Sequence, residues 1–191
     1  ISITSPTASA FLATNTPDVE FTVVYENNGS CVDISSLKIK VDSQILTNTS
    51  AGVTVSTITN GYSIKYVPQM AFSDGVHKVT VNCSDHDGNS ATEKTVSFTV
   101  DTVAPTLTVT QPKENGTYVA SAVFTVKGAT NDVTSSVASI VIKLNGADQG
   151  DVAVDSAGSF EKTVTLKEGG NTIEVTANDR AGKTTTVSRT I

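Results

Sequence analysis

One sequence pattern occurs twice in this chain, and the two copies lie about a hundred residues apart, a spacing typical of repeated domains. A repeat of this length indicates two copies of one domain rather than one large fold. We therefore predict a first domain at residues 1–101 and a second at residues 102–191. The matched segments are 1–6 with 107–112, 21–23 with 124–126, and 75–88 with 169–182.

Each copy consists of short runs in which apolar and polar residues alternate, separated by turns rich in Gly, Asn and Asp. A period of two is typical of strands that bury one face. About seven such strands in each copy predict an all-β chain of two β-sandwiches. The second and third strands of the copies are predicted to align without a gap. The first copy is longer near residues 47–60, where we expect an enlarged region able to carry binding specificity.

Composition narrows the classes of partner. The formal net charge is −6 at pH 7, and no run of basic residues is present, which argues against nucleic acid as a partner. No run of apolar residues approaches the length of a membrane span, so we predict no membrane insertion of this chain. Because the chain begins without Met, we expect it to be a piece of a longer protein.

Residues and motifs typical of active sites are few in this sequence. The chain has 2 His, and it contains neither a nucleophile elbow nor a phosphate-binding loop. We therefore predict that it is not an enzyme. Aromatic residues make up 5% and Trp is absent, so a stacking platform for sugars is not indicated, although sugar binding stays open.

Several segments resemble bacterial immunoglobulin-like domains. They are Asp-Thr-Val-Ala-Pro at 101–105, Asn-Gly at 145–146, Gly-Ser-Phe at 158–160, and the run at 168–182. Such domains are strung in tandem in large surface proteins, adhesins and secreted multidomain enzymes. The resemblance implies two tandem immunoglobulin-like β-sandwich domains in an extracellular or cell-surface protein. Pro105 restricts the short linker, so we expect the domains to lie end to end with limited bending.

Three functions are compatible with this resemblance. The first is a rigid spacer or adhesive stalk that presents neighbouring domains of the same parent protein and that contacts a host or cell-surface protein or glycan. The second is an accessory module of a secreted hydrolase, which positions substrate for a catalytic domain elsewhere in the parent. The third is a binding head that uses the outer loops of the first copy, with Asn27, Asn28, Asp33, Asp87 and Asn89 as candidate contact residues.

Both cysteines, Cys31 and Cys83, fall in the first copy. Cys83 shares a strand face with Val79 and Val81 and so points into the core. In an immunoglobulin-like sandwich the loop that holds Cys31 lies at the same end, which predicts a disulfide between the two. The alternative is two unpaired thiols, one buried and one exposed.

Asp85 with Gly88, and Asp179 with Gly182, occupy equivalent positions in the two copies. We predict that each Asp caps a tight turn by accepting backbone N–H bonds, while each Gly supplies a positive φ. The segment at 85–89 does not fit a calcium-binding EF-hand loop, because Gly and the final acid fall at the wrong positions.

A second role is possible for Asp179. In the implied topology, the loops that hold Asp132 and Asp179 face the preceding domain, and Asp101 lies in the linker. Together with Asp74, these carboxylates form a candidate calcium site between the domains, since calcium accepts several oxygen ligands at flexible geometry. No other cofactor is predicted.

Overall fold

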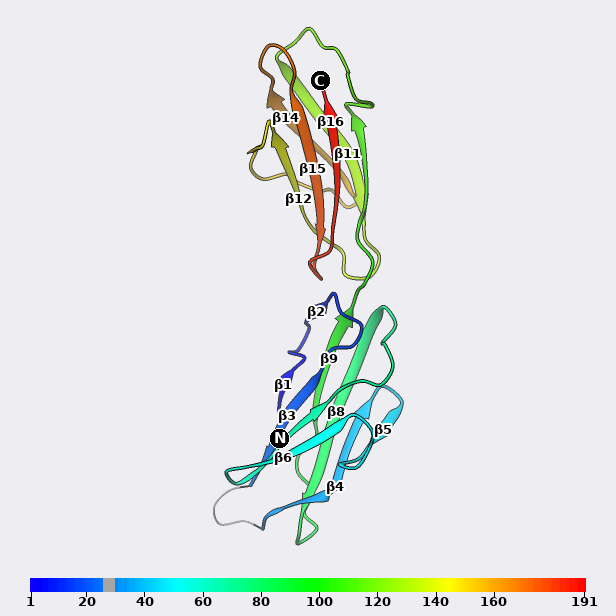
Figure 1. Ribbon diagram of the computed structural model, residues 1–191, viewed down its shortest axis with the longest axis vertical. Helices are drawn as coiled ribbons and strands as arrows, with labels where there is room; N and C mark the ends of the chain where they lie inside the picture. The colour runs from blue at the N-terminus through cyan, green and yellow to red at the C-terminus, as the bar shows by residue number, and fades with distance from the viewer. Residues whose placement is uncertain (26–29) are drawn as a thin grey trace. The chain divides into compact units, whose positions relative to one another are not determined.

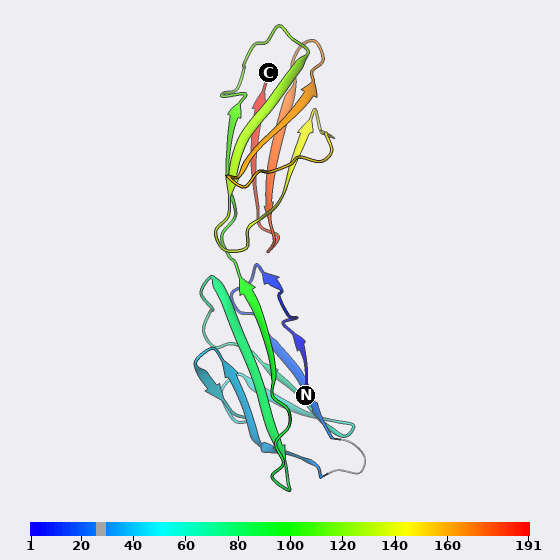
Figure 2. The same cartoon turned by 180° about the vertical axis from the view of Figure 1, so that it is seen from behind.

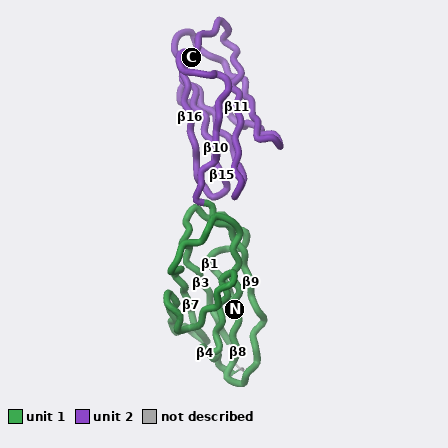
Figure 3. The backbone as a smooth tube through the Cα atoms, turned by 90° about the vertical axis from the view of Figure 1, so that its right-hand side faces the viewer, with its two compact units in different colours: residues 1–101 green, residues 102–191 purple. Residues whose placement is uncertain are grey.

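The computed structural model describes residues 1–25 and 30–191, and the elements in these ranges are all strands. It divides into two compact units, Ile1–Asp101 and Thr102–Ile191 (Figure 3). No helix suited to crossing a membrane occurs in the described ranges.

The first unit contains two sheets whose inner faces enclose one core (Figure 1). The strand order is β1-β3-β7-β6 in one sheet and β2-β9-β8-β4-β5 in the other. The strands are β1 (Ser2–Ser5), β2 (Phe11–Leu12), β3 (Val19–Val24), β4 (Val32–Val41), β5 (Gln44–Leu46), β6 (Val53–Ile58), β7 (Gly61–Tyr66), β8 (Gly75–Asp85) and β9 (Lys94–Val100).

Alternation along the strands builds this core. Val19, Phe21 and Val23 are at most 2% exposed and alternate with outward residues of β3. Across from them, Val79 and Val81 of β8 are fully buried. Successive side chains of a strand point to opposite faces, so the period-two pattern of the sequence becomes one apolar face on each sheet.

The second unit repeats this arrangement with fewer strands. Its sheets have the orders β10-β11-β14 and β13-β12-β15-β16, and in Figure 2 the lime β11 lies beside the orange β14. Val126, Ile142, Ile173, Val175 and Ala177 are fully buried at its centre. The strands are β10 (Thr106–Gln111), β11 (Val123–Asn131), β12 (Val137–Leu144), β13 (Ala147–Asp148), β14 (Ser159–Thr165), β15 (Thr172–Asp179) and β16 (Thr184–Thr190).

The structure corrects the predicted alignment of the second strands. Ile3 of β1 pairs with Phe21, whereas Val109 of β10 pairs with Gly128. Val109 matches Ile3 in the repeat, so Phe21 corresponds to Gly128 rather than to Phe124. The predicted match is therefore wrong by four residues. Because side chains alternate with a period of two, a four-residue slip keeps the same face inward, and the pattern alone does not reveal it.

The added length predicted near residues 47–60 of the first copy becomes a strand. It forms β6, which pairs with β7 along its whole length. In the described part of the second unit, the sheet ends instead at β14, which corresponds to β7. The insertion therefore widens one sheet of the first unit.

Candidate metal centre

Asp179 ends β15 and holds the turn that follows. Its Oδ1 accepts the Lys183 N–H at 2.8 Å, and the backbones of Asp179 and Lys183 are also bonded. Gly182 has φ of 87°, in the left-handed region that Gly adopts at no steric cost. The predicted turn-capping roles of Asp179 and Gly182 are therefore seen in the structure.

The equivalent turn of the first unit is held in the same way. Asp85 Oδ1 accepts the N–H groups of Asp87 at 3.0 Å and Asn89 at 2.8 Å, and its Oδ2 accepts the Asn89 side-chain amide at 2.9 Å. Gly88 has φ of 85°. Hydrogen bonds from Asn89 favour the ionised carboxylate and lower the pKa of Asp85 below its ordinary value of 3.8.

We expect Asp85→Ala to lower the unfolding midpoint of the first unit by a few degrees. Asp85→Asn, which keeps the Oδ1 acceptor, should have a smaller effect. Because the pKa of Asp85 is lowered in the folded state, its ionic contribution is present above pH 3.8 and is lost as the pH falls through the folded value. Thermal melts from pH 7 to pH 2 would check this, since the gap between wild type and Asp85→Asn should close in acid. A constant gap would contradict the proposed ionic contribution.

Asp132 organises the loop between β11 and β12. Its Oδ1 accepts the backbone N–H groups of Thr134 at 3.1 Å, Ser135 at 2.8 Å and Ser136 at 2.8 Å. These bonds fix the position of the carboxylate. All three bonds end on Oδ1, so Oδ2 remains available to coordinate a cation.

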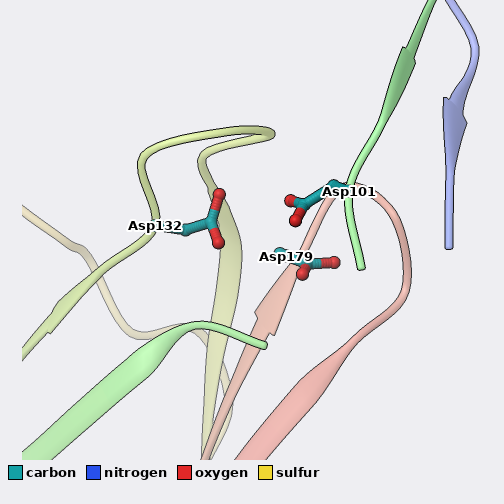
Figure 4. Close-up of side chains that lie close together, drawn as sticks. All are labelled: Asp101, Asp132 and Asp179. Carbon is teal, nitrogen blue, oxygen red and sulfur yellow. The ribbon is translucent and has the colours of Figure 1, made fainter. Parts of the chain in front are cut away.

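The structure brings together three of the four predicted metal ligands. Carboxylate oxygens of Asp101, Asp132 and Asp179 lie within 4.8 Å of one another (Figure 4). Asp101, from which the linker starts, is buried, and Asp179 is 4% exposed. Asp74, the fourth predicted ligand, is exposed and does not belong to this group.

Two properties of this carboxylate cluster favour a cation. Three like charges at such a separation repel one another, and burial strengthens the repulsion because less water screens it. In addition, Asp179 Oδ2 is buried without a hydrogen-bond partner. A hard divalent cation such as Ca²⁺ takes carboxylate, carbonyl and water oxygens as ligands. It would therefore offset the repulsion between the carboxylates and give Asp179 Oδ2 a partner.

The predicted disulfide is corrected by the structure, in which Cys31 and Cys83 are both free. Val32 of β4 pairs with Asp85 of β8, and Val32 and Cys83 are both buried, so they share the inward face. Cys31 precedes Val32, just outside β4, and is exposed, so its surroundings differ from those of the buried Cys83. Its thiol is instead hydrogen-bonded with the Tyr25 hydroxyl, which raises the pKa of Tyr25.

We expect one thiol per native chain to react rapidly with Ellman's reagent. That thiol is Cys31, because Cys83 is 2% exposed and burial raises its pKa, which disfavours the reactive thiolate. Cys31→Ser should remove the fast phase, and denaturant should release the second thiol. Reductant should leave the unfolding midpoint unchanged. A native chain without a rapidly reacting thiol would contradict the free-thiol arrangement.

The candidate binding loops are described only in part. Asn27 and Asn28 lie outside the described residues. Asp33 accepts the N–H and hydroxyl of Ser35, which lower its pKa, and its pairing with Ser84 places it at the same end of the unit as Asp87 and Asn89. Asp87 and Asn89 are exposed in the turn that Asp85 holds.

The hydrogen bonds of the His77 ring were not predicted from the sequence. This residue is 7% exposed, with Nδ1 2.8 Å from Asp42 Oδ2 and Nε2 2.8 Å from Ser73 O. Its ring also packs against Phe72 and Phe98. The sequence pattern could have predicted the inward direction of the ring, because His77 lies two residues before Val79 and so shares its strand face. His77 therefore links β8 to the β4–β5 turn and to the segment before β8.

Comparison with known proteins assigns both halves of the chain. Residues 14–102 match the family described as "Bacterial Ig-like domain", and residues 105–191 match "Glucodextranase, domain B". Bacillopeptidase F of Bacillus subtilis (strain 168) is 31% identical over 112 residues, which are 59% of this chain and 7% of that protein. The chain thus spans a small part of this relative's length.

Among solved structures, the fibronectin(III)-like modules of Clostridium thermocellum CbhA are similar to this chain with a TM-score of 0.56 and 18% identity. The match covers 100% of this chain and 92% of the modules. At this identity the likeness shows the fold alone, and it agrees with the two family matches. The first unit therefore matches the bacterial Ig-like family and the second matches glucodextranase domain B, and the chain is a tandem pair of immunoglobulin-like β-sandwich domains, as the resemblance of its sequence predicted.

Proposed function

We propose that this tandem pair is a non-catalytic spacer or stalk in a cell-surface or secreted bacterial protein, where it presents neighbouring domains. The observation that carries the proposal is that each unit closes its own apolar core, so each is a self-sufficient module. The match to 7% of a much longer relative supports a modular role within a larger protein.

The linker supports a spacer with limited bending. β9 ends at Val100 and β10 begins at Thr106, so only residues 101–105 connect the units. Pro105 has a restricted φ, and its carbonyl accepts the Thr185 hydroxyl at 2.6 Å, which ties the end of the linker to β16. A divalent cation held by Asp101, Asp132 and Asp179 would restrain the start of the linker as well.

Residual dipolar couplings of the two units test the spacer proposal. In a rigid spacer, the alignment tensors fitted separately to residues 1–100 and 106–191 should agree in magnitude and orientation when calcium is present. Chelation should make them diverge if the carboxylate cluster restrains the linker. Unequal tensors in both conditions would mean that the units move independently and would overturn the rigid-spacer proposal.

The runner-up is an accessory module of a secreted hydrolase. It is favoured by the names of two matches, glucodextranase domain B and bacillopeptidase F. Tyr118, which is 99% exposed, is the aromatic side chain of the second unit best placed to contact a sugar. Retention on a cross-linked dextran column that is lost in Tyr118→Ala would support this function. Passage through the column without delay would favour the spacer.

A further inference from the structure

Three lysines lie on the outward face of one sheet in the first unit, on the adjacent strands β4 and β8 (Figure 1). On β4, Lys38 and Lys40 flank the fully buried Ile39. On β8, Lys78 precedes the fully buried Val79. Because the side chains of a strand alternate between its faces, the three lysines point away from the core, and all are exposed. We call Lys38, Lys40 and Lys78 the lysine face.

Strand register sets the spacing of the lysine face. Lys40 pairs with Thr80, and Lys78 lies two residues before Thr80, so Lys40 and Lys78 are diagonal neighbours. Positions two apart on one strand are separated by about 6.5 Å, and diagonal neighbours on adjacent strands by about 7–8 Å. The bases of Lys38, Lys40 and Lys78 therefore form one row with two similar steps.

No carboxylate of the described residues neutralises this row. The ion pairs in that part of the chain do not include Lys38, Lys40 or Lys78. The neighbouring Asp42 accepts the backbone N–H of Lys78 at 2.8 Å and faces the His77 ring, so its oxygens are already engaged. In a chain with a formal net charge of −6, the lysine face is therefore a local concentration of positive charge.

The second unit balances the charge at the equivalent position. Matching strand registers make Lys143 of β12 the counterpart of Lys40. Lys143 lies opposite Glu174, with 3.9 Å between Nζ and Oε1, whereas Lys40 lies opposite an uncharged Thr. The counterparts of the other two lysines are uncharged, namely Val141 and Thr172. The lysine face thus belongs to the first unit and is not a consequence of the shared fold.

The residues around the lysine face favour a hydrophilic partner. Thr95 and Ser97 of β9 are exposed and pair with Thr80 and Lys78, so they add hydroxyl groups beside the row. Interfaces between proteins are enriched in aromatic residues, Met and Arg, and depleted in Lys. The outward positions of β4 and β8 in residues 38–41 and 76–82 contain none of the enriched types. Ammonium and hydroxyl groups together match a sugar polymer that carries negative charge.

The charge density of the partner can also be inferred. Double-stranded DNA carries one negative charge per about 1.7 Å of its axis, which is far denser than the row of lysines. The net charge of the chain, −6, repels such a polymer. A polysaccharide with one carboxylate per sugar is less densely charged, and it presents hydroxyl groups between its charges. The lysine face is therefore better suited to an anionic polysaccharide than to a nucleic acid.

We propose that the lysine face binds an anionic polysaccharide, whose chain lies along the row from Lys38 through Lys40 to Lys78. The ammonium groups pair with carboxylates of the polymer, and the hydroxyl groups of β9 bond with its sugars. Exposed ion pairs are individually weak and are screened by salt, so the binding is weak and falls as salt is added. This site lies on the first unit alone and does not depend on the proposed spacer function.

Titration of the full chain with short polygalacturonate chains, followed by amide NMR at low salt, tests the proposal. Chelator is present throughout, so that calcium binds neither the probe nor the carboxylate cluster. Amide signals of β4 and β8 should shift. Lys40→Gln should weaken binding about fivefold, the effect typical of one lysine beside an anionic surface. Replacing Lys38, Lys40 and Lys78 together by Gln should abolish the shifts, while the remaining spectrum shows that the variant is folded.

Lys143→Gln is the matched control, because it removes the same charge from the equivalent position of the second unit. It should leave the affinity unchanged. Dextran, which is uncharged, should not shift the signals of β4 and β8, and polyglutamate, which has charge without sugar, should bind more weakly than polygalacturonate. The proposal would be overturned by unshifted β4 and β8 signals, by an equal loss of affinity in Lys143→Gln, or by polyglutamate that binds as tightly.

Discussion

Calcium is expected to raise the unfolding midpoint of this chain by about 10 °C or more when its concentration is a hundredfold above the dissociation constant. Under that condition a ligand that binds only the folded state stabilises it by about 2.7 kcal/mol, and each kcal/mol shifts a domain of this size by about 4–8 °C. The physical reason is the carboxylate cluster of Asp101, Asp132 and Asp179, whose repulsion a divalent cation offsets. Calorimetry with calcium and then with chelator measures the shift.

Asp179→Asn separates the cation from other effects of calcium. The Asn side chain keeps an oxygen that can accept the Lys183 N–H, so the turn is preserved, but it removes one charge from the cluster. The calcium-dependent rise should therefore vanish. In chelator, the variant should be at least as stable as wild type because one repulsive charge is gone.

The matched control is Asp155→Asn. Asp155 also caps a turn of the second unit, accepting the N–H groups of Ala157 at 2.9 Å and Ser159 at 2.8 Å, but it lies outside the cluster. This variant should keep the full response to calcium. A calcium response that survives in Asp179→Asn, or that is absent from wild type, would contradict the cation site.

Phe98→Ala is expected to destabilise the first unit by about 3–5 kcal/mol, the cost typical of emptying a large buried aromatic site. Phe98 is 1% exposed on β9, and its ring meets the Phe72 ring edge-on at a centroid distance of 5.7 Å. It also packs beside His77. Removing the ring leaves a cavity beside His77, whose ring is held by hydrogen bonds to Asp42 and Ser73 and cannot readily move into it.

Chemical denaturation followed by residue-specific NMR would resolve the two units. The transition of the second unit should stay in place, because Phe98 belongs to the core of the first alone. Val76→Ala, on the exposed face of the neighbouring β8, is the control and should stay within about 0.5 kcal/mol of wild type. Transitions that move together in Phe98→Ala would contradict the independence of the two cores.

The sequence predicted those features whose cause lies within a few residues. Val79, Val81 and Cys83 alternate with polar neighbours, and all three are buried as that period requires. The turns at Asp85 and Asp179 could also be predicted from the sequence, because an Asp that caps a turn accepts hydrogen bonds from N–H groups two to four residues ahead.

Pairing between distant segments was predicted less well. The prediction of a disulfide between Cys31 and Cys83 was wrong. Cys31 lies just outside a strand, so the alternation of the strand did not determine where its thiol would point. The match of Phe21 to Phe124 failed because a four-residue slip leaves the same face inward. In both cases the local pattern was right and the partner was wrong.

The sequence by itself therefore determined the tandem β-sandwich architecture, the inward faces of the strands and the capped turns, because a repeat, a period of two and a short-range hydrogen bond are all local properties. Only the tertiary structure decided that Asp101, Asp132 and Asp179 meet without Asp74, and that His77 lies between Asp42 and Ser73. Such encounters depend on strand register and loop path, which bring together residues far apart in the chain and which alternation leaves undetermined.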